Sequence, residues 1–561
     1  MSDPHTQPAN TSARDRLGGR LILVAALLLA LVPRVRGLGG WWLNPDEGIY
    51  YSILTRQAFA GFWAEVTANA HPPLYYLILR GLGYLTWDFV GLRAFSVVCG
   101  LGAVAAVWAA ARELTRQEQG TGHGNPTKRL DLGVSGAIAG LLVALSPGAI
   151  EMSQVMRPYM LQLALLAGGL WLLLRYRRAP SRRDLGWYIL LVSLALLTHY
   201  SSVLALGVFA GLVAVDGVER GLGRREWRVL VAAHLVPAAL VVALYFVHLR
   251  PLAASALADD ALNGWLSFYM IDSPSGAWLS FLGYQSLVAI AWLRGPLALL
   301  LLAVPVVALA RRDRMPAAVT VGAFAVAIAA AAVDAYPLGS TRHSTWLIAF
   351  TAPVLGWLGS LVTRMAPKGA LAVTAAVAAL FVAGGPVGSA LGADRAPWAP
   401  SDHVLTRANM GRMIDLVDRS AEPELLVMSA QTFYLLLPFF PGERELAVFS
   451  ADSTLFHFPY GKRSVLVSKS WDFTAGPDPR VASHLARALA RANRAFPELS
   501  LNARDEAELL VGGWRPPLVD ELTSPGLSEP VTAGERVVPG LFGFLLDLPG
   551  LRRAFEVDSD R

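Results

Sequence analysis

Two adjacent carboxylates, Asp46 and Glu47, lie in the stretch WWLNPDEGIYYS, directly after the first apolar run of the chain. Ionisable groups beside lipid are costly, so they are candidates for function wherever they occur. A carboxylate can accept the proton of a hydroxyl nucleophile. Neighbours in sequence cannot readily face each other across a substrate, as the paired acids of glycoside hydrolysis do. We therefore expect one acid to act in chemistry and the other in support.

Cationic and hydrogen-bonding side chains recur at four later points of the chain. They belong to the segments HPPL, EMSQVMRPYM, LLTHYSS and DAYPLGSTRHS, and they are His71, Arg157, Tyr159, His199, Tyr200, Arg342 and His343. Arginine binds phosphate through charge-assisted hydrogen bonds. Each group also has an ordinary alternative. The acids could cap a helix, Arg157 could snorkel to the headgroups, and HPPL could be a chain turn. His199 and Tyr200 could be interfacial anchors, and Arg342 and His343 ordinary interface charges. Their convergence on one face would favour a shared site.

The composition indicates an integral membrane protein. The chain is 54% hydrophobic and only 16% charged, with a mean hydropathy of +0.45. Apolar surface on this scale must be buried or lie in lipid. The net charge of +6 is carried by short loops between apolar runs, which is typical of membrane topology and not of nucleic-acid binding. The single cysteine, Cys99, excludes an intrachain disulfide.

Repeated apolar runs predict about eleven transmembrane helices. We expect them near residues 20–38, 90–112, 132–149, 158–175, 185–200, 201–216, 228–248, 295–310, 317–335, 344–363 and 370–388. Five alternate loops hold eighteen Lys or Arg residues, and the loops between them hold six. The basic set is expected to face the cytoplasm, with the amino terminus inside and everything after about residue 390 outside the cytoplasmic (inner) membrane.

Three features depart from this simple pattern. The segment 71–85 is short and opens with two prolines, so we expect it to lie along the outer membrane surface. The segment 276–295 could cross, but that would move the basic loop RRDR outside, so a re-entrant or interfacial segment is expected. Arg34 and Arg36, at the outer end of the first span, do not follow the charge rule.

The predicted fold is an all-α polytopic membrane bundle followed by a small α/β domain. The expected units are a cytoplasmic tail over 1–19, a transmembrane catalytic domain over 20–390 and an extracytoplasmic domain over 391–561. In the last unit, ELLVMSA and SVLVSKS are typical of buried strands, whereas VASHLARALARANRAF is typical of an amphipathic helix.

With this topology, the unusual polar residues collect on the outer face, within reach of lipid. Carboxylates and several cations there suit a substrate that has a phosphate head on a lipid tail. A phosphate that leaves a sugar needs charge stabilisation rather than a general acid. The acceptor hydroxyl is a poor nucleophile and needs a base, so one carboxylate suffices.

Several of these segments together resemble the GT-C superfamily of membrane glycosyltransferases. They are the Asp-Glu pair, HPPLYYLIL, LRAFSVVCGLGAV, SPGAIEMSQVMRPYMLQLALL, LLTHYSS and RHSTWLIAFTAPVLG. The chain is most similar to the bacterial branch of glycosyltransferase family 39, with the protein O-mannosyltransferases and the aminoarabinose transferases of lipid A. The resemblance covers about residues 20 to 390.

The resemblance implies inverting transfer of a sugar from a polyprenyl-phosphate donor, with short juxtamembrane helices in the first outer loop. It implies that Asp46 is the catalytic base, with Glu47 in support. Arg157 and Tyr159 would lie near the site, and Arg342 would bind phosphate. His343 stands where relatives often have tyrosine, and HPPL replaces the KPPL of the aminoarabinose branch.

The implied partners are a polyprenyl-phosphate-linked sugar donor, membrane lipid and an acceptor hydroxyl on a protein, a lipid or a glycan. No nucleic acid and no metal are expected. A divalent cation such as Mg²⁺ or Mn²⁺ is the alternative, with Glu151 as a further ligand. The alternative functions are a lipid-linked sugar transporter or flippase, and a non-catalytic, membrane-anchored binding protein.

Overall fold

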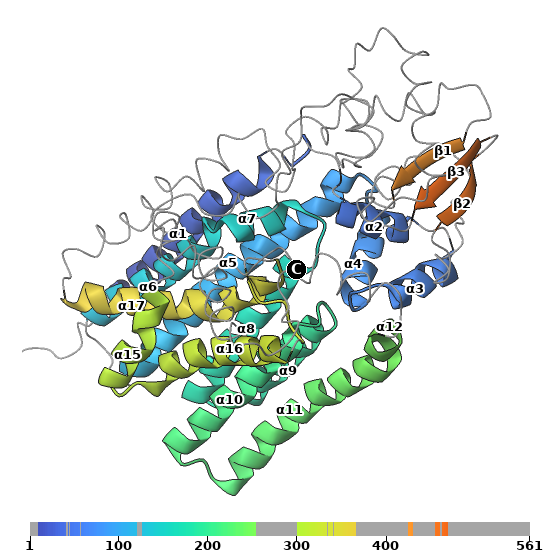
Figure 1. The fold of residues 1–561 in the computed structure, drawn as a ribbon. Helices are drawn as coiled ribbons and strands as arrows, with labels where there is room; N and C mark the ends of the chain where they lie inside the picture. The colour runs from blue at the N-terminus through green and yellow to red at the C-terminus, as the bar shows by residue number, and fades with distance from the viewer. Residues whose placement is uncertain are drawn as a thin grey trace, which may run out of the picture.

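The computed structural model describes most of the first two-thirds of the chain and three later strands. The described residues are 9–36, 38–40, 43, 45–55, 58–119, 126–253, 300–333, 335–339, 342–365, 425–429, 455–460 and 463–468. The predicted segment 276–295, the predicted span 370–388 and most of the predicted domain 391–561 lie outside these residues. The described part is a bundle of long helices with short helices gathered at one end (Figure 1).

Ten helices form the bundle, and each overlaps a segment that the hydropathy pattern predicts to span the membrane. They are α1 (Ala9–Val35), α5 (Phe89–Gln119), α6 (Pro126–Ala144), α8 (Tyr159–Arg178), α9 (Arg182–Leu196), α10 (Ser202–Arg220), α11 (Arg224–Leu244), α15 (Ala303–Ala310), α16 (Arg314–Ala332) and α17 (Ile348–Met365). Within the described residues, six helices are long and apolar enough to cross a membrane, or seven with one bent pair. The count of eleven stays a prediction.

Short elements connect the long helices. They are α2 (Pro45–Leu54), α3 (Phe59–Ala68), α4 (Leu74–Gly83), α7 (Pro147–Gln154), the π-helix η1 (Tyr245–Leu249), α12 (Arg250–Ala253) and the 3₁₀-helix η4 (Arg342–Leu347). The first three have ten residues each, about 15 Å, which is half the thickness of a hydrocarbon core. The helix predicted within 71–85 is therefore too short to cross.

The short helices α2, α3 and α4 are tied to one another by Arg80 of α4. Its Nη1 donates a hydrogen bond of 3.0 Å to the Leu54 carbonyl at the end of α2. Its guanidinium lies 4.5 Å from the ring centre of Phe62 in α3. One cation therefore joins all three helices, which form a group at one end of the bundle (Figure 1).

The predicted span over 132–149 is broken. Helix α6 ends at Ala144 and α7 begins at Pro147, with a bend of 58° between them. Proline lacks an N–H group and disfavours helical conformation in the preceding residue, so it ends α6. The break leaves the last carbonyl groups of α6 without partners inside the helix.

Arg34 of α1 supplies those partners. Its guanidinium is fully buried and donates hydrogen bonds to the carbonyls of Val143 and Ala144, at 2.9 and 2.7 Å, and to Ser153 Oγ at 3.0 Å. A cation at a helix carboxyl end is favoured by the helix dipole. Arg34 therefore departs from the charge rule because it caps a broken helix inside the protein.

Three described strands form a mixed sheet in the order β1-β3-β2. They are β1 (Leu425–Ser429), β2 (Leu455–Tyr460) and β3 (Arg463–Ser468). Strands β1 and β3 are parallel, with Val427 opposite Leu466, and β2 is antiparallel to β3. The two segments predicted as strands correspond to β1 and β3, and the rest of the predicted α/β domain stays a prediction.

Close packing of α17 against α6 requires a small residue at Gly356. A methyl group at this position would lie 2.4 Å from the Ser135 carbonyl oxygen and 3.0 Å from Ala139 Cβ. We expect Gly356→Ala to lower the free energy of unfolding by about 1–3 kcal/mol, because backbone atoms cannot move aside as a flexible side chain can. The measurement is thermal unfolding of the protein in detergent.

The matched control is Gly211→Ala in α10, where a methyl group meets no atom within 4 Å. Alanine gains up to about 1 kcal/mol of helix propensity over glycine. The control is therefore expected to keep or raise the unfolding temperature. Equal shifts in the two variants would contradict the tight α6–α17 contact.

Candidate functional site

Side chains from five separate segments meet at the end of the bundle where α2 and α4 lie. These segments are α2, the turn before α4, the link between α7 and α8, the turn between α9 and α10, and η4. The structure brings together eight of the nine predicted site residues: Asp46, Glu47, His71, Arg157, Tyr159, His199, Arg342 and His343. These eight residues therefore lie close together in the structure.

Asp46 lies between two arginines. Arg342 Nη1 is 2.5 Å from Asp46 Oδ2, and Arg157 Nη2 is 3.5 Å from the same oxygen. The side chains of Asp46 and Arg342 are 27% and 30% exposed, whereas that of Arg157 is 7% exposed. A ligand can therefore reach the carboxylate and one guanidinium group from outside, with a second guanidinium group behind them.

Glu47 has a different environment from its neighbour. It is fully buried, and its two carboxylate oxygens accept hydrogen bonds from Arg93 Nε at 2.8 Å and Nη2 at 2.6 Å. Its Oε1 also accepts the Met156 N–H at 2.7 Å. The carboxylate thus joins α2 to α5 and to the link that carries Arg157.

The link between α7 and α8 presents Arg157. Its N–H donates to the Val155 carbonyl at 2.9 Å in a tight turn, and Pro158 then leads into α8. The guanidinium lies 5.0 Å from the ring centre of Tyr50 and 5.8 Å from that of Tyr159. Aromatic faces attract cations, so these rings help to hold the buried charge.

A hydrogen-bond chain holds the segment that carries Arg342. Trp346 Nε1 donates to the Tyr336 hydroxyl at 3.1 Å, and that hydroxyl donates to the His343 carbonyl at 3.1 Å. Ser344 Oγ donates to the Gly339 carbonyl at 2.8 Å. Because Trp346 is fully buried, the turn at Arg342 is anchored in the bundle.

Three histidines lie beside the arginines. Ring centres are 5.1 Å apart for His71 and His199, and 5.8 Å apart for His199 and His343. The Tyr159 ring lies 5.1 Å from His199 and 6.0 Å from His343. In the described ranges, no three His, Cys, Asp or Glu side chains are placed to hold a metal ion.

Burial and the two arginines together set the protonation states in this group. Burial raises the pKa of Asp46, but the charges of Arg157 and Arg342 outweigh it and hold that pKa below its usual 3.8. Burial and the same two charges lower the pKa of His199 to about 3, and the pKa of His71 also falls well below its usual range. Near neutral pH, Asp46 is therefore ionised and both histidines are neutral.

The side chain of Tyr200 contacts a histidine outside the group of predicted site residues. Its hydroxyl contacts His248 Nδ1 in η1, and the two rings stack with centres 5.8 Å apart. His248 Nε2 in turn lies 3.2 Å from the carbonyl of Val66 in α3. Tyr200 thus links α11 and α3 to the turn between α9 and α10.

The sequence analysis did not single out Arg93. It lies in the first turns of α5 and is 1% exposed. An ionisable residue inside an apolar run is itself a signal of a buried partner. That signal could have identified Arg93, although not its pairing with Glu47.

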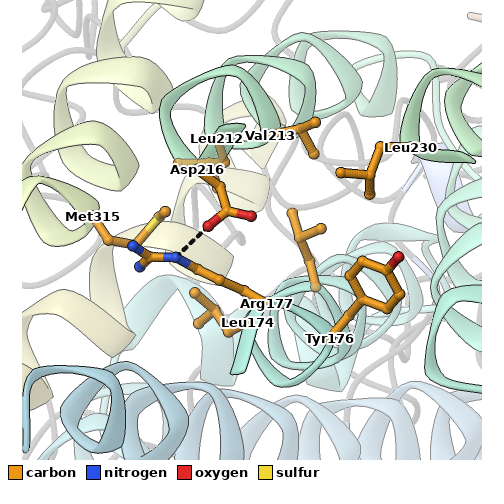
Figure 2. Close-up of a pocket in the computed structure, with 9 residues that line it drawn as sticks. Leu174, Tyr176, Arg177, Leu212, Val213, Asp216, Leu230 and Met315 are labelled. Atoms are coloured by element: carbon orange, nitrogen blue, oxygen red, sulfur yellow. Dashed lines mark hydrogen bonds and ion pairs between the residues drawn. The ribbon is translucent and has the colours of Figure 1, made fainter. Parts of the chain in front are cut away.

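The pocket drawn in Figure 2 lies at the end of α8 opposite to Tyr159. It is lined by residues that include Arg177 and Asp216, whose Nε and Oδ1 atoms are 2.6 Å apart. Arg177 belongs to the last turn of α8, whereas Tyr159 begins that helix. Eighteen residues of helix separate them by about 27 Å, so this pocket is not part of the candidate site.

No family model and no curated protein matches the chain. Among solved structures, it is similar to ArnT from Cupriavidus metallidurans bound to undecaprenyl phosphate, with a TM-score of 0.46 and 14% identity over 74% of this chain and 84% of that one. It is also similar to an Archaeoglobus fulgidus oligosaccharyltransferase tethered to an acceptor peptide, with a TM-score of 0.44 and 12% identity over 74% and 63% of the two chains.

The buried pair of Glu47 and Arg93 generates a stability prediction. Glu47→Gln removes the charge that compensates Arg93, and breaking a buried pair costs about 3–5 kcal/mol. We expect a large drop in the unfolding temperature of the protein in detergent. Glu226→Gln is the matched control, because Glu226 is 52% exposed and lies 3.9 Å from Arg220.

The control is expected to lose less than about 1 kcal/mol, as exposed ion pairs usually do. A Glu47→Gln variant as stable as the Glu226→Gln variant would show that the buried contact does not hold the three segments together.

Proposed function

We propose that the chain is an inverting glycosyltransferase that moves a sugar from a polyprenyl-phosphate donor to an acceptor hydroxyl. The observation that carries this proposal is the convergence of Arg157 and Arg342 on the partly exposed carboxylate of Asp46. A base beside two phosphate-binding cations is the set of groups that this transfer needs. The polyprenyl part of the donor is inferred from the resemblance of the sequence to the GT-C superfamily.

In the proposed step, Asp46 accepts the proton of the acceptor hydroxyl while the oxygen attacks the anomeric carbon. A new bond forms between that oxygen and the sugar, and the bond from the sugar to the phosphate oxygen breaks. The electron pair of the broken bond stays on the phosphate, which gains one negative charge. The carboxylate loses one negative charge on protonation, so the total charge of the group is unchanged.

Arg157 and Arg342 stabilise the charge that develops on the departing phosphate. Guanidinium groups keep their charge and donate several hydrogen bonds in a fixed plane, which suits phosphate oxygens. A cation already held in place stabilises a transition state without reorganising at the moment of reaction. Glu47 and Arg93 act as positioning residues, because Glu47 accepts the Met156 N–H beside Arg157 and Arg93 holds Glu47 in place.

The histidines are supporting groups in this proposal. Neutral His71 and His199, with the ring of Tyr159, are buried beside the arginines and form the inner wall of the site. The acceptor is a hydroxyl of a protein, a lipid or a glycan. The reaction takes place on the outer face of the cytoplasmic membrane and needs no metal ion.

The substitution Asp46→Asn tests the assignment of the base. An amide cannot accept the proton, so we expect transfer from a polyprenyl-phosphate sugar to fall by about 10²–10⁴-fold. Initial rates with radiolabelled donor measure this loss, and thermal unfolding checks that the variant is folded. Asp88→Asn, which removes an exposed carboxylate between α4 and α5, is expected to transfer at the rate of the unchanged protein. Retained transfer in Asp46→Asn would remove the base from the proposal.

The depressed pKa values predict how the donor kcat/KM depends on pH. A base whose pKa lies below 3.8 stays ionised as pH falls from 8 to 5, and histidines with lowered pKa values stay neutral over the same interval. Because kcat/KM reports groups of the free enzyme, we expect it to change less than about threefold between about pH 5.5 and about pH 7.5. If kcat/KM instead fell on the acid side with an apparent pKa near 6.5, the base would be assigned to a histidine.

A further inference from the structure

Asp46 engages both of the arginines that the proposed mechanism assigns to the phosphate. The two guanidinium groups approach one carboxylate oxygen, at 2.5 Å from Arg342 and 3.5 Å from Arg157. Phosphate oxygens make the same charge-assisted contacts with arginine. The carboxylate therefore occupies donor groups that a phosphate would use.

This arrangement is unsuited to proton abstraction. Two guanidinium groups stabilise the ionised carboxylate and so weaken it as a base. A general base works best when its pKa lies near the operating pH. The ion pairs seen here must therefore loosen before Asp46 can take a proton from a hydroxyl.

The surroundings allow such a change at Asp46 but not at Glu47. Asp46 and Arg342 are each more than a quarter exposed, so a ligand can approach them. Arg157 Nε is buried and has no hydrogen-bond partner in the part of the chain that the structure describes. Glu47 is held by Arg93 and the Met156 N–H, so it keeps the backbone in place while Asp46 moves.

We propose that Asp46 and the donor phosphate compete for Arg157 and Arg342, so that binding of the donor releases the carboxylate to act as the base. This inference rests on the proposed function. Two guanidinium groups and one carboxylate have one net positive charge, which the single charge of a phosphodiester donor neutralises. The carboxylate of Asp46 is then free to act as a base only when a donor is bound.

The test is the affinity of the full chain in detergent for undecaprenyl phosphate, the lipid phosphate that the proposed transfer would release, measured by equilibrium binding. Asp46→Asn removes the competing charge and is expected to tighten binding by about tenfold or more. The repulsion of one like charge about 4 Å away corresponds to about fivefold in affinity in water and to nearly a thousandfold at an effective dielectric constant of about 20. Asp88→Asn removes the same charge from an exposed position and is expected to change the affinity by less than about twofold.

A double-variant cycle assigns the effect to the arginines. In an Arg342→Gln background, Asp46→Asn is expected to raise the affinity for undecaprenyl phosphate by a smaller factor. The guanidinium group for which the carboxylate and the phosphate compete is absent there. Undecaprenol and inorganic phosphate are the comparison ligands, and both are expected to bind more weakly than undecaprenyl phosphate. If inorganic phosphate bound as tightly as undecaprenyl phosphate, a donor with a lipid tail would be contradicted.

The outcomes separate this inference from the proposed function. Unchanged or weaker binding by Asp46→Asn would overturn the competition, even if transfer is lost as the proposed function expects. Failure of the unchanged protein to bind undecaprenyl phosphate would contradict the proposed function itself. An equal gain in both backgrounds would also overturn the inference, because it would place the effect away from Arg342.

Discussion

The candidate site depends on one buried carboxylate. Glu47 is fully removed from solvent, and its carboxylate accepts hydrogen bonds from Arg93 Nε and Nη2 and from the Met156 N–H. A buried charge without its partner is strongly unfavourable, so the three segments are fixed relative to one another. The residue before Glu47 is Asp46, and the residue after Met156 is Arg157. One interaction therefore places the carboxylate of Asp46 and the guanidinium of Arg157 side by side.

The two adjacent acids show how environment divides their roles. Glu47 is buried and pairs with Arg93, whereas Asp46 is partly exposed and pairs with Arg342, which a ligand can also reach. The opposite end of the bundle differs in kind. There, Arg177 pairs with Asp216 and with Glu219, and Arg178 pairs with Glu113. Those ion pairs join the end of α8 to the ends of α10 and α5.

Hydropathy and charge predicted much of the architecture, because lipid imposes a strong pattern on the sequence. The bundle helices, the short helix after HPPL and two strands of the later sheet follow from local pattern. The break at Pro147 and the roles of Arg34 and Arg93 do not follow from local pattern. A pattern identifies a residue that is costly in lipid, but its partner is set by tertiary packing. The carboxylate that pairs with Arg93 lies 46 residues away, and the carbonyls that Arg34 caps lie more than a hundred residues away.

The most direct test of the account is a structure of the chain bound to undecaprenyl phosphate. We predict phosphate oxygens within about 3 Å of guanidinium nitrogens of both Arg157 and Arg342. Asp46 is expected to have turned from them toward the acceptor side, with the contact between Glu47 and Arg93 intact. A phosphate bound away from these two arginines, or Asp46 facing the opposite side of the membrane from it, would contradict the account.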